Sequence, residues 1–103
     1  MKSQTIPKAF KKSFPVSGEI KVFQIENPWV YVRVPKKYTQ MLKPLADRGL
    51  VSIAVTFGKS IWDTSLMPMG DGTQFIPLSA KIRKAEGVQV GDHIKLSFSL
   101  RKR

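Results

Sequence analysis

Cysteine is absent from this chain, and histidine occurs once, at position 93. Without cysteine the chain forms no disulfide bond and no thiolate metal site. A single histidine among scattered carboxylates does not build a zinc site of nitrogen and sulfur ligands either. We therefore expect no metal and no cofactor, and the absence of cysteine fits a reducing compartment.

Acidic residues are scarce: seven Asp and Glu stand against 18 Lys and Arg, for a net charge of +11. So much positive charge on 103 residues attracts polyanions such as nucleic acid, acidic proteins or anionic lipid. The same charge also serves solubility alone. The composition thus leaves two interpretations open, a polyanion partner or a well-solvated surface.

Long apolar runs are missing as well, and no stretch reaches the roughly 20 residues of a membrane-spanning helix. Residues 1–12 are mixed and basic, with no apolar segment behind them, which is unlike a secretory signal. We interpret residues 1–12 as a flexible basic arm and residues 13–103 as one domain. The expected location is the cytoplasm, with no membrane contact.

The dominant pattern in the chain is an alternation of apolar and polar side chains with period two, which is typical of strands. Three stretches show it clearly, and their predicted buried faces are Val30, Val32 and Val34; Val51, Ile53, Val55 and Phe57; and Ile94, Leu96, Phe98 and Leu100. Such strands bury one side and wet the other, as in antiparallel sheets.

Three further strands are expected at residues 14–25, 59–66 and 73–78. In the first, the apolar positions change parity after Val22, which predicts a β-bulge near Val22 and Phe23. Between the other two, Gly70, Asp71 and Gly72 supply a turn. Pro77 lacks an N–H group, so we expect it at a sheet edge or a bulge.

Two short helices are expected. Tyr38, Met41, Leu42 and Leu45 have helical spacing after Pro35, and Pro44 should end that helix early. Ser79 and Gly87 would cap a second helix at its two ends. The predicted fold is therefore mainly β, a small closed or nearly closed antiparallel β-barrel of about six strands with one or two short helices.

Several spaced motifs resemble the bacterial family called "domain of unknown function 1905". They are the segment Trp29-Val30-Tyr31-Val32-Arg33-Val34-Pro35, the run 65–72, Ile76-Pro77-Leu78, the run 81–84 and Gly91-Asp92. The similarity extends from about Phe14 to Leu100. It implies a small β-barrel and brings no established activity, cofactor or catalytic residues.

The residues do not predict an enzyme. His93 with Asp92 and Ser97 or Ser99 resembles a catalytic triad in composition only, because the serines lie in a regular strand without an oxyanion hole. The Gly70-Asp71-Gly72 turn lacks the spacing of a phosphate-binding loop. We therefore expect a non-catalytic protein.

The candidate binding residues are aromatic and basic. Trp29, Tyr31 and Arg33 share one strand face, which would either stack on a planar ligand or pack as a second buried face. Lys81, Arg83 and Lys84 would contact an anion or simply favour the negative end of their helix. Trp62 is assigned to the core, and Arg83 is expected to pair with an acid such as Asp71. Arg101, Lys102 and Arg103 add a basic tail.

The favoured hypothesis is a non-catalytic binding module for a polyanion such as nucleic acid. The alternative is an interaction or scaffold barrel that binds a protein partner or a small ligand, in a pocket lined by Phe, Trp and Met. One contiguous basic face would favour the first hypothesis, and an even spread of basic residues the second.

Overall fold

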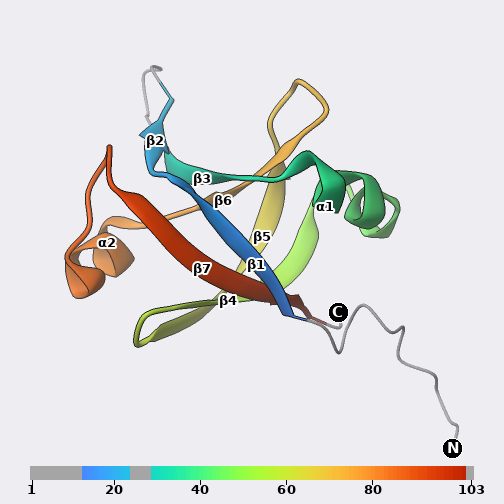
Figure 1. Ribbon diagram of the computed structural model, residues 1–103. Helices are drawn as coiled ribbons and strands as arrows, with labels where there is room; N and C mark the ends of the chain where they lie inside the picture. Colours follow the sequence, from blue (N-terminus) through green and yellow to red (C-terminus); the bar gives the residue numbers. More distant parts are fainter. Residues whose placement is uncertain (1–12, 24–28, 102–103) are drawn as a thin grey trace, which may run out of the picture.

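The computed structural model describes residues 13–23 and 29–101 (Figure 1). Its elements, in chain order, are β1 (Ser13–Glu19), β2 (Lys21–Val22), β3 (Val30–Val34), α1 (Lys36–Leu42), the 3-10 turn η2 (Lys43–Leu45), β4 (Val51–Phe57), β5 (Ser60–Pro68), β6 (Gln74–Pro77), α2 (Ala80–Glu86) and β7 (His93–Leu100). The predicted nearly closed antiparallel barrel is confirmed, with seven strands in place of about six. The predicted arm at residues 1–12 lies outside the described residues.

The strands follow the order β1-β7-β4-β5-β6-β3-β2, with antiparallel pairing throughout. The strands at the two ends of this order, β1 and β2, are consecutive in the chain and meet at Ile20. There the Ile20 N–H donates to the Asp92 carbonyl, and the Gly91 N–H donates to the Ile20 carbonyl, both at 2.8 Å. One continuous segment therefore pairs with both edges and nearly closes the barrel.

The predicted bulge near Val22 and Phe23 is misplaced. The strand breaks at Ile20, where the chain leaves β7 and begins to pair with β3. Ile20 is fully buried. Its side chain therefore still points into the core at the place where the chain changes its partner strand. The parity change seen in the sequence reflects Phe23, which stacks on Tyr31 on the outside of the barrel. Ile25 lies outside the described residues.

The interior matches the alternation in the sequence. Each predicted inward residue of β4 and β7 is buried, and so are Val32 and Val34 of β3, while Val30 is partly buried. Burial of these side chains supplies the main stabilisation, at about 25 cal/mol per Å² of apolar surface removed from water. Trp62 packs partly buried against this core, in line with its assigned place.

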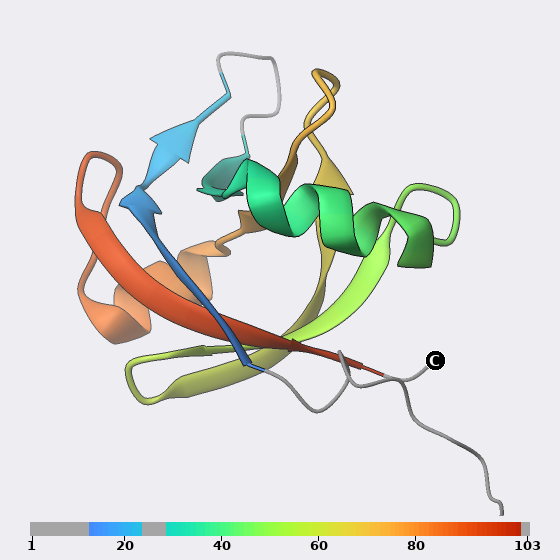
Figure 2. The ribbon, with the colours of Figure 1, turned by 45° about the vertical axis from the view of Figure 1, so that its right-hand side comes forward.

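Helix α1 lies across the mouth of the barrel (Figure 2). Tyr38 and Leu42 point into the core, and the Tyr38 ring meets Phe14 edge-on with centroids 5.2 Å apart. Pro44 turns the helix into η2, as predicted. The predicted apolar face is only half right, because Met41 and Leu45 are exposed and Thr39 is buried in their place.

Helix α2 lies on the opposite side of the barrel from α1 (Figure 1). The Ser79 hydroxyl accepts from the Ile82 N–H, and Gly87 ends the helix with φ of +67°, so both predicted caps are confirmed. Glu86 accepts a hydrogen bond from the Ser60 hydroxyl and holds α2 to the start of β5. In the part of the chain that the structure describes, no helix is long and apolar enough to cross a membrane.

Candidate binding cleft

A cleft opens in the barrel wall where β5 and β6 separate. The two strands pair only at Met67 with Phe75 and at Pro68 with Gln74, whereas β5 pairs with β4 from Ser60 to Leu66. The Leu78 N–H donates to Val30, so the neighbouring residue, Pro77, directs its ring nitrogen toward β5. Because proline has no N–H, pairing with β5 cannot continue there. Pro77 thus occupies a local edge, as predicted.

The cleft has a volume of about 460 Å³, and we call it the tryptophan cleft. Trp29 directly precedes β3, Trp62 and Thr64 belong to β5, and Ser79 and Arg83 belong to α2 and its cap. Pockets of about 300–1,000 Å³ suit small ligands or single groups of larger ones. Trp29 and Arg83 were predicted as binding residues from the sequence, whereas Trp62 was assigned to the core because its inward position in the alternation fits a core residue equally well.

The Arg83 side chain is anchored by a hydrogen bond to a nearby backbone carbonyl. Its Nε donates to the Leu78 carbonyl at 3.2 Å, which holds the guanidinium at the cleft while leaving the N–H groups of Nη1 and Nη2 as further donors. The expected pair with Asp71 is wrong. Asp71 instead lies 3.6 Å from Arg33 Nη2, since the β5–β6 hairpin curls toward β3 and not toward α2.

Asp63 is the acidic residue among the described lining residues of the cleft. Its carboxylate lies 3.5 Å from Arg101 Nε, and both side chains are about half exposed. Exposed pairs of this kind contribute little to stability, but the guanidinium offsets the negative charge beside the cleft. Arg101, predicted as a ligand contact, is therefore placed near the cleft through Asp63.

The outer face of β3 and β6 carries a separate aromatic cluster. Tyr31 stacks on Phe23 with centroids 4.4 Å apart, and Phe75 meets Phe23, Trp29 and Tyr31 edge-on. Tyr31 is only 7% exposed, so it packs as part of a second buried face, whereas Trp29 is 42% exposed. The sequence left two interpretations open for this strand face. Tyr31 packs as part of a second buried face, whereas Trp29 is accessible for stacking on a ligand.

Trp29 also borders a shallow hollow of about 250 Å³ on its other side, together with Phe23, Met67, Pro68 and Phe75. Its Phe, Trp and Met side chains are the lining that the alternative hypothesis, a barrel that binds a small ligand, predicts for its pocket. The Trp29 indole therefore stands between an apolar hollow and a cleft that carries Arg83.

The other predicted basic residues do not gather around the cleft. Lys81 and Lys84 are exposed on α2 without lining it, Arg33 is engaged with Asp71, and Arg103 lies outside the described residues. A second group of basic residues lies on and after α1, on the opposite side of the barrel (Figure 1): Lys36, Lys37, Lys43 and Arg48. The described residues therefore present no single basic face, which was the arrangement expected to favour a polyanion partner, and on this point the charge distribution favours the interaction or scaffold barrel.

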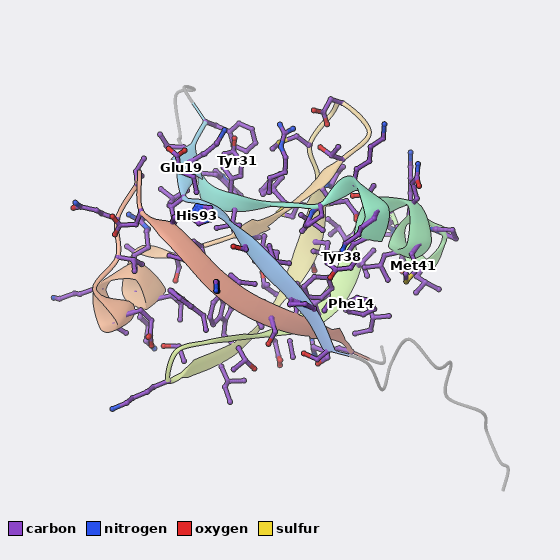
Figure 3. The ribbon with its side chains drawn as sticks, in the orientation of Figure 1. Phe14, Glu19, Tyr31, Tyr38, Met41 and His93 are labelled. Carbon is purple, nitrogen blue, oxygen red and sulfur yellow. The ribbon has the colours of Figure 1, made fainter. Side chains whose placement is uncertain are left out.

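His93 lies at the start of β7 and is exposed. Its Nε2 is 3.3 Å from the Ser17 hydroxyl, and Glu19 is its neighbour across the β1–β7 pair (Figure 3). The serine in contact is thus Ser17, not Ser97 or Ser99. Within residues 13–23 and 29–101, no three His, Asp or Glu side chains come together as a metal site would require.

Comparison with known proteins identifies the family of the chain. The sequence model of the family described as "Domain of unknown function (DUF1905)" matches residues 17–98. A search of curated proteins finds no match. The matched segment holds β2 to α2 entire, with the end of β1 and most of β7, so it includes the whole tryptophan cleft. This chain therefore belongs to the DUF1905 family.

Proposed function

We propose that the protein is a non-catalytic binding module for single-stranded nucleic acid, with the tryptophan cleft as its contact site. The observation that carries the proposal is the meeting of Trp29, Trp62 and Arg83 around one cleft of about 460 Å³. A base can stack on an indole face while the guanidinium contacts the adjacent phosphate.

The distribution of charge favours a single strand over a duplex. A rigid duplex is best met by one continuous basic surface, whereas the basic residues of α1 and α2 lie on opposite sides of the barrel. A flexible strand needs only a local site with an aromatic platform and a few cations. The net charge of +11 then draws the strand toward the protein from a distance.

The same cleft supports a second candidate, a small planar anion such as a mononucleotide. Its volume falls in the range of small-molecule pockets, and a cleft bordered by two indoles accommodates one ring. The two candidates differ in length dependence. A strand gains affinity with each added contact, while a mononucleotide site gains nothing from further nucleotides.

The deciding experiment measures fluorescence anisotropy of labelled eight-nucleotide DNA and RNA strands at low and moderate salt. Competitors are the matching duplex, mononucleotides and polyglutamate, which tests charge alone. We expect micromolar binding of single strands that weakens steeply with salt. Binding of polyglutamate with equal strength would contradict recognition of bases.

Trp29→Ala should weaken binding of the strand by about 5- to 150-fold, which corresponds to the 1–3 kcal/mol of one stacked base. Met41→Ala is the matched control, since Met41 is an exposed apolar residue on the far side, at α1. Arg83→Ala should lower both affinity and its salt dependence, with Lys95→Ala as the control for loss of one exposed charge. Equal effects of Trp29→Ala and Met41→Ala would remove the cleft from the proposal.

A further inference from the structure

A second cavity lies between the α1 end of the barrel and the β5–β6 hairpin, away from the tryptophan cleft. It has a volume of about 350 Å³, and we call it the glutamine cavity. Thr39 of α1 and Lys43 of η2 line one side, and Gln74 of β6 with Gly70 and Gly72 of the hairpin line the other. Its residues have no part in the function proposed above.

Two buried polar side chains meet at this cavity. Thr39 is 3% exposed and Gln74 is 4% exposed, and they are the buried polar residues of the described chain. Within that part of the chain, Thr39 Oγ1 and Gln74 Oε1 have no hydrogen-bond partner. Buried polar atoms of folded proteins are nearly always paired. These two oxygens are covered from solvent within the wall of the same cavity, so a ligand would pair with them by displacing the atoms that cover them.

Neither residue is required there by the fold. Gln74 occupies an inward position of β6, in alternation with the buried Ile76 and Leu78, where an apolar side chain would complete the core. Thr39 lies between the buried Tyr38 and Leu42 on α1, where valine would have the same shape. Both positions therefore hold hydrogen-bonding groups at a cost to the core, which is typical of a binding site.

The lining residues restrict the chemistry of a ligand. The Gln74 amide oxygen accepts a hydrogen bond, and the Thr39 hydroxyl both donates and accepts, so a ligand with hydroxyl groups satisfies both. Lys43 is the charged residue among the described lining residues, and its ammonium favours an anionic group. Gly70 and Gly72, which carry no side-chain carbon, and the small Ala46 leave room for a compact molecule.

We propose that the glutamine cavity binds a small hydroxylated anion, with its hydroxyl groups at Thr39 and Gln74 and its charge at Lys43. The anionic group can be a carboxylate or a phosphate, because a single lysine attracts either. The site is separate from the tryptophan cleft, so a test of this proposal does not depend on whether the protein binds nucleic acid.

The test is a nuclear magnetic resonance titration of the full chain, labelled with ¹⁵N, against four probes: gluconate, glucose 6-phosphate, glucose and inorganic phosphate. At about 10 mM probe, a concentration that fills even weak sites, we expect gluconate or glucose 6-phosphate to shift the Gln74 side-chain amide and the Gly70 and Gly72 backbone amides. Neutral glucose should bind more weakly. The two hydroxylated anions separate the carboxylate from the phosphate.

Variants then assign the contacts. Thr39→Val with Gln74→Leu should weaken binding of the anionic sugar at least tenfold. Thr56→Val with Gln89→Leu, both at exposed positions, should leave it unchanged. Lys43→Gln should weaken the charged probes roughly two- to fivefold and leave glucose unaffected.

The wild-type shift map decides the matter even if the double variant fails to fold. Absence of shifts at Gln74 with all four probes would overturn the proposal. Shifts with inorganic phosphate that reach Lys43 but not Gln74 would also overturn it, because they would show charge attraction alone. Binding that survives in a folded double variant would place the ligand elsewhere.

Discussion

The tryptophan cleft and the glutamine cavity arise in opposite ways. The cleft forms because backbone pairing stops at Pro77, and large aromatic side chains line the opening. The cavity forms where pairing is complete, since Gln74 pairs with both Val34 and Pro68, and small or polar side chains leave the space. A small barrel therefore gains a hollow either from its backbone or from its side chains, and the two kinds should respond to different substitutions.

The largest effect should come from the core that both hollows share. Phe98 stacks on Phe14 and meets Tyr38 edge-on, at the centre of the barrel. Phe98→Ala should lower the free energy of unfolding by about 3–5 kcal/mol, as measured by urea denaturation. Ligand binding at both hollows should fall together, and a variant that lost only one would show that the two are not built on a single core.

The next effect separates the cleft from the cavity. Gly58 has φ of +59°, and a Cβ there would collide with the Glu86 carboxylate, which holds α2 to Ser60. Gly58→Ala should therefore cost more than the ~1–2 kcal/mol of the left-handed backbone alone and should loosen the α2 wall of the cleft.

Gly87→Ala is its matched control, because Gly87 has φ of +67° and open space around its Cβ position. The difference between the two variants in chemical denaturation measures the contact with Glu86. Equal losses of stability would show that Glu86 does not hold the wall, and the glutamine cavity should be unaffected in both proteins.

A smaller effect of opposite sign is expected at the cavity. Thr39→Val removes an unpaired buried hydroxyl and keeps the shape of the side chain, so it should raise the free energy of unfolding by about 1 kcal/mol. Thr56→Val, at an exposed site of β4, is the control and should change stability little. A loss of stability in Thr39→Val would show that the hydroxyl is paired in solution.

The smallest effect concerns the hairpin that borders the cavity. Hydrogen bonds from the Thr73 side chain and backbone, together with the Arg33 guanidinium, lower the pKa of Asp71 below its usual value. A carboxyl with a lowered pKa in the folded state stabilises the protein above its unfolded-state pKa, and this contribution disappears as pH falls through the lower folded value.

Asp71→Asn should therefore be slightly less stable at neutral pH and equal to the parent in strong acid, in thermal unfolding across pH. Because the carboxyl is exposed, only a small shift in the midpoint is expected. A difference between the two proteins that grows toward acid pH would contradict this assignment.

The buried strand faces and the presence of both helices were predictable because each depends on residues close together in the sequence. Alternation identified the inward residues of β4 and β7, and Ser79 with Gly87 identified the ends of α2. The corner at Ile20 was not predictable. It depends on a change of partner strand, and the amino acid at position 20 gives no sign of that change.

The candidate sites were less predictable for a related reason. The sequence identified Trp29 and Arg83 but could not pair Asp71 with Arg33, since that contact depends on how the hairpin curls over β3. Thr39 and Gln74 gave no signal, because polar residues in a sequence are expected at the surface. Only their burial in the folded chain makes them unusual.

The pairing of β1 with β7 has a consequence for how the chain folds. These strands lie at opposite ends of the described chain, and Ser17 contacts His93 across 76 residues of sequence. Contacts so distant cost more chain entropy before they form and slow folding. During synthesis the hairpin of β4 and β5 can form early, but the barrel stays open along one seam until β7 leaves the ribosome, with the edge strands exposed to other chains in the meantime.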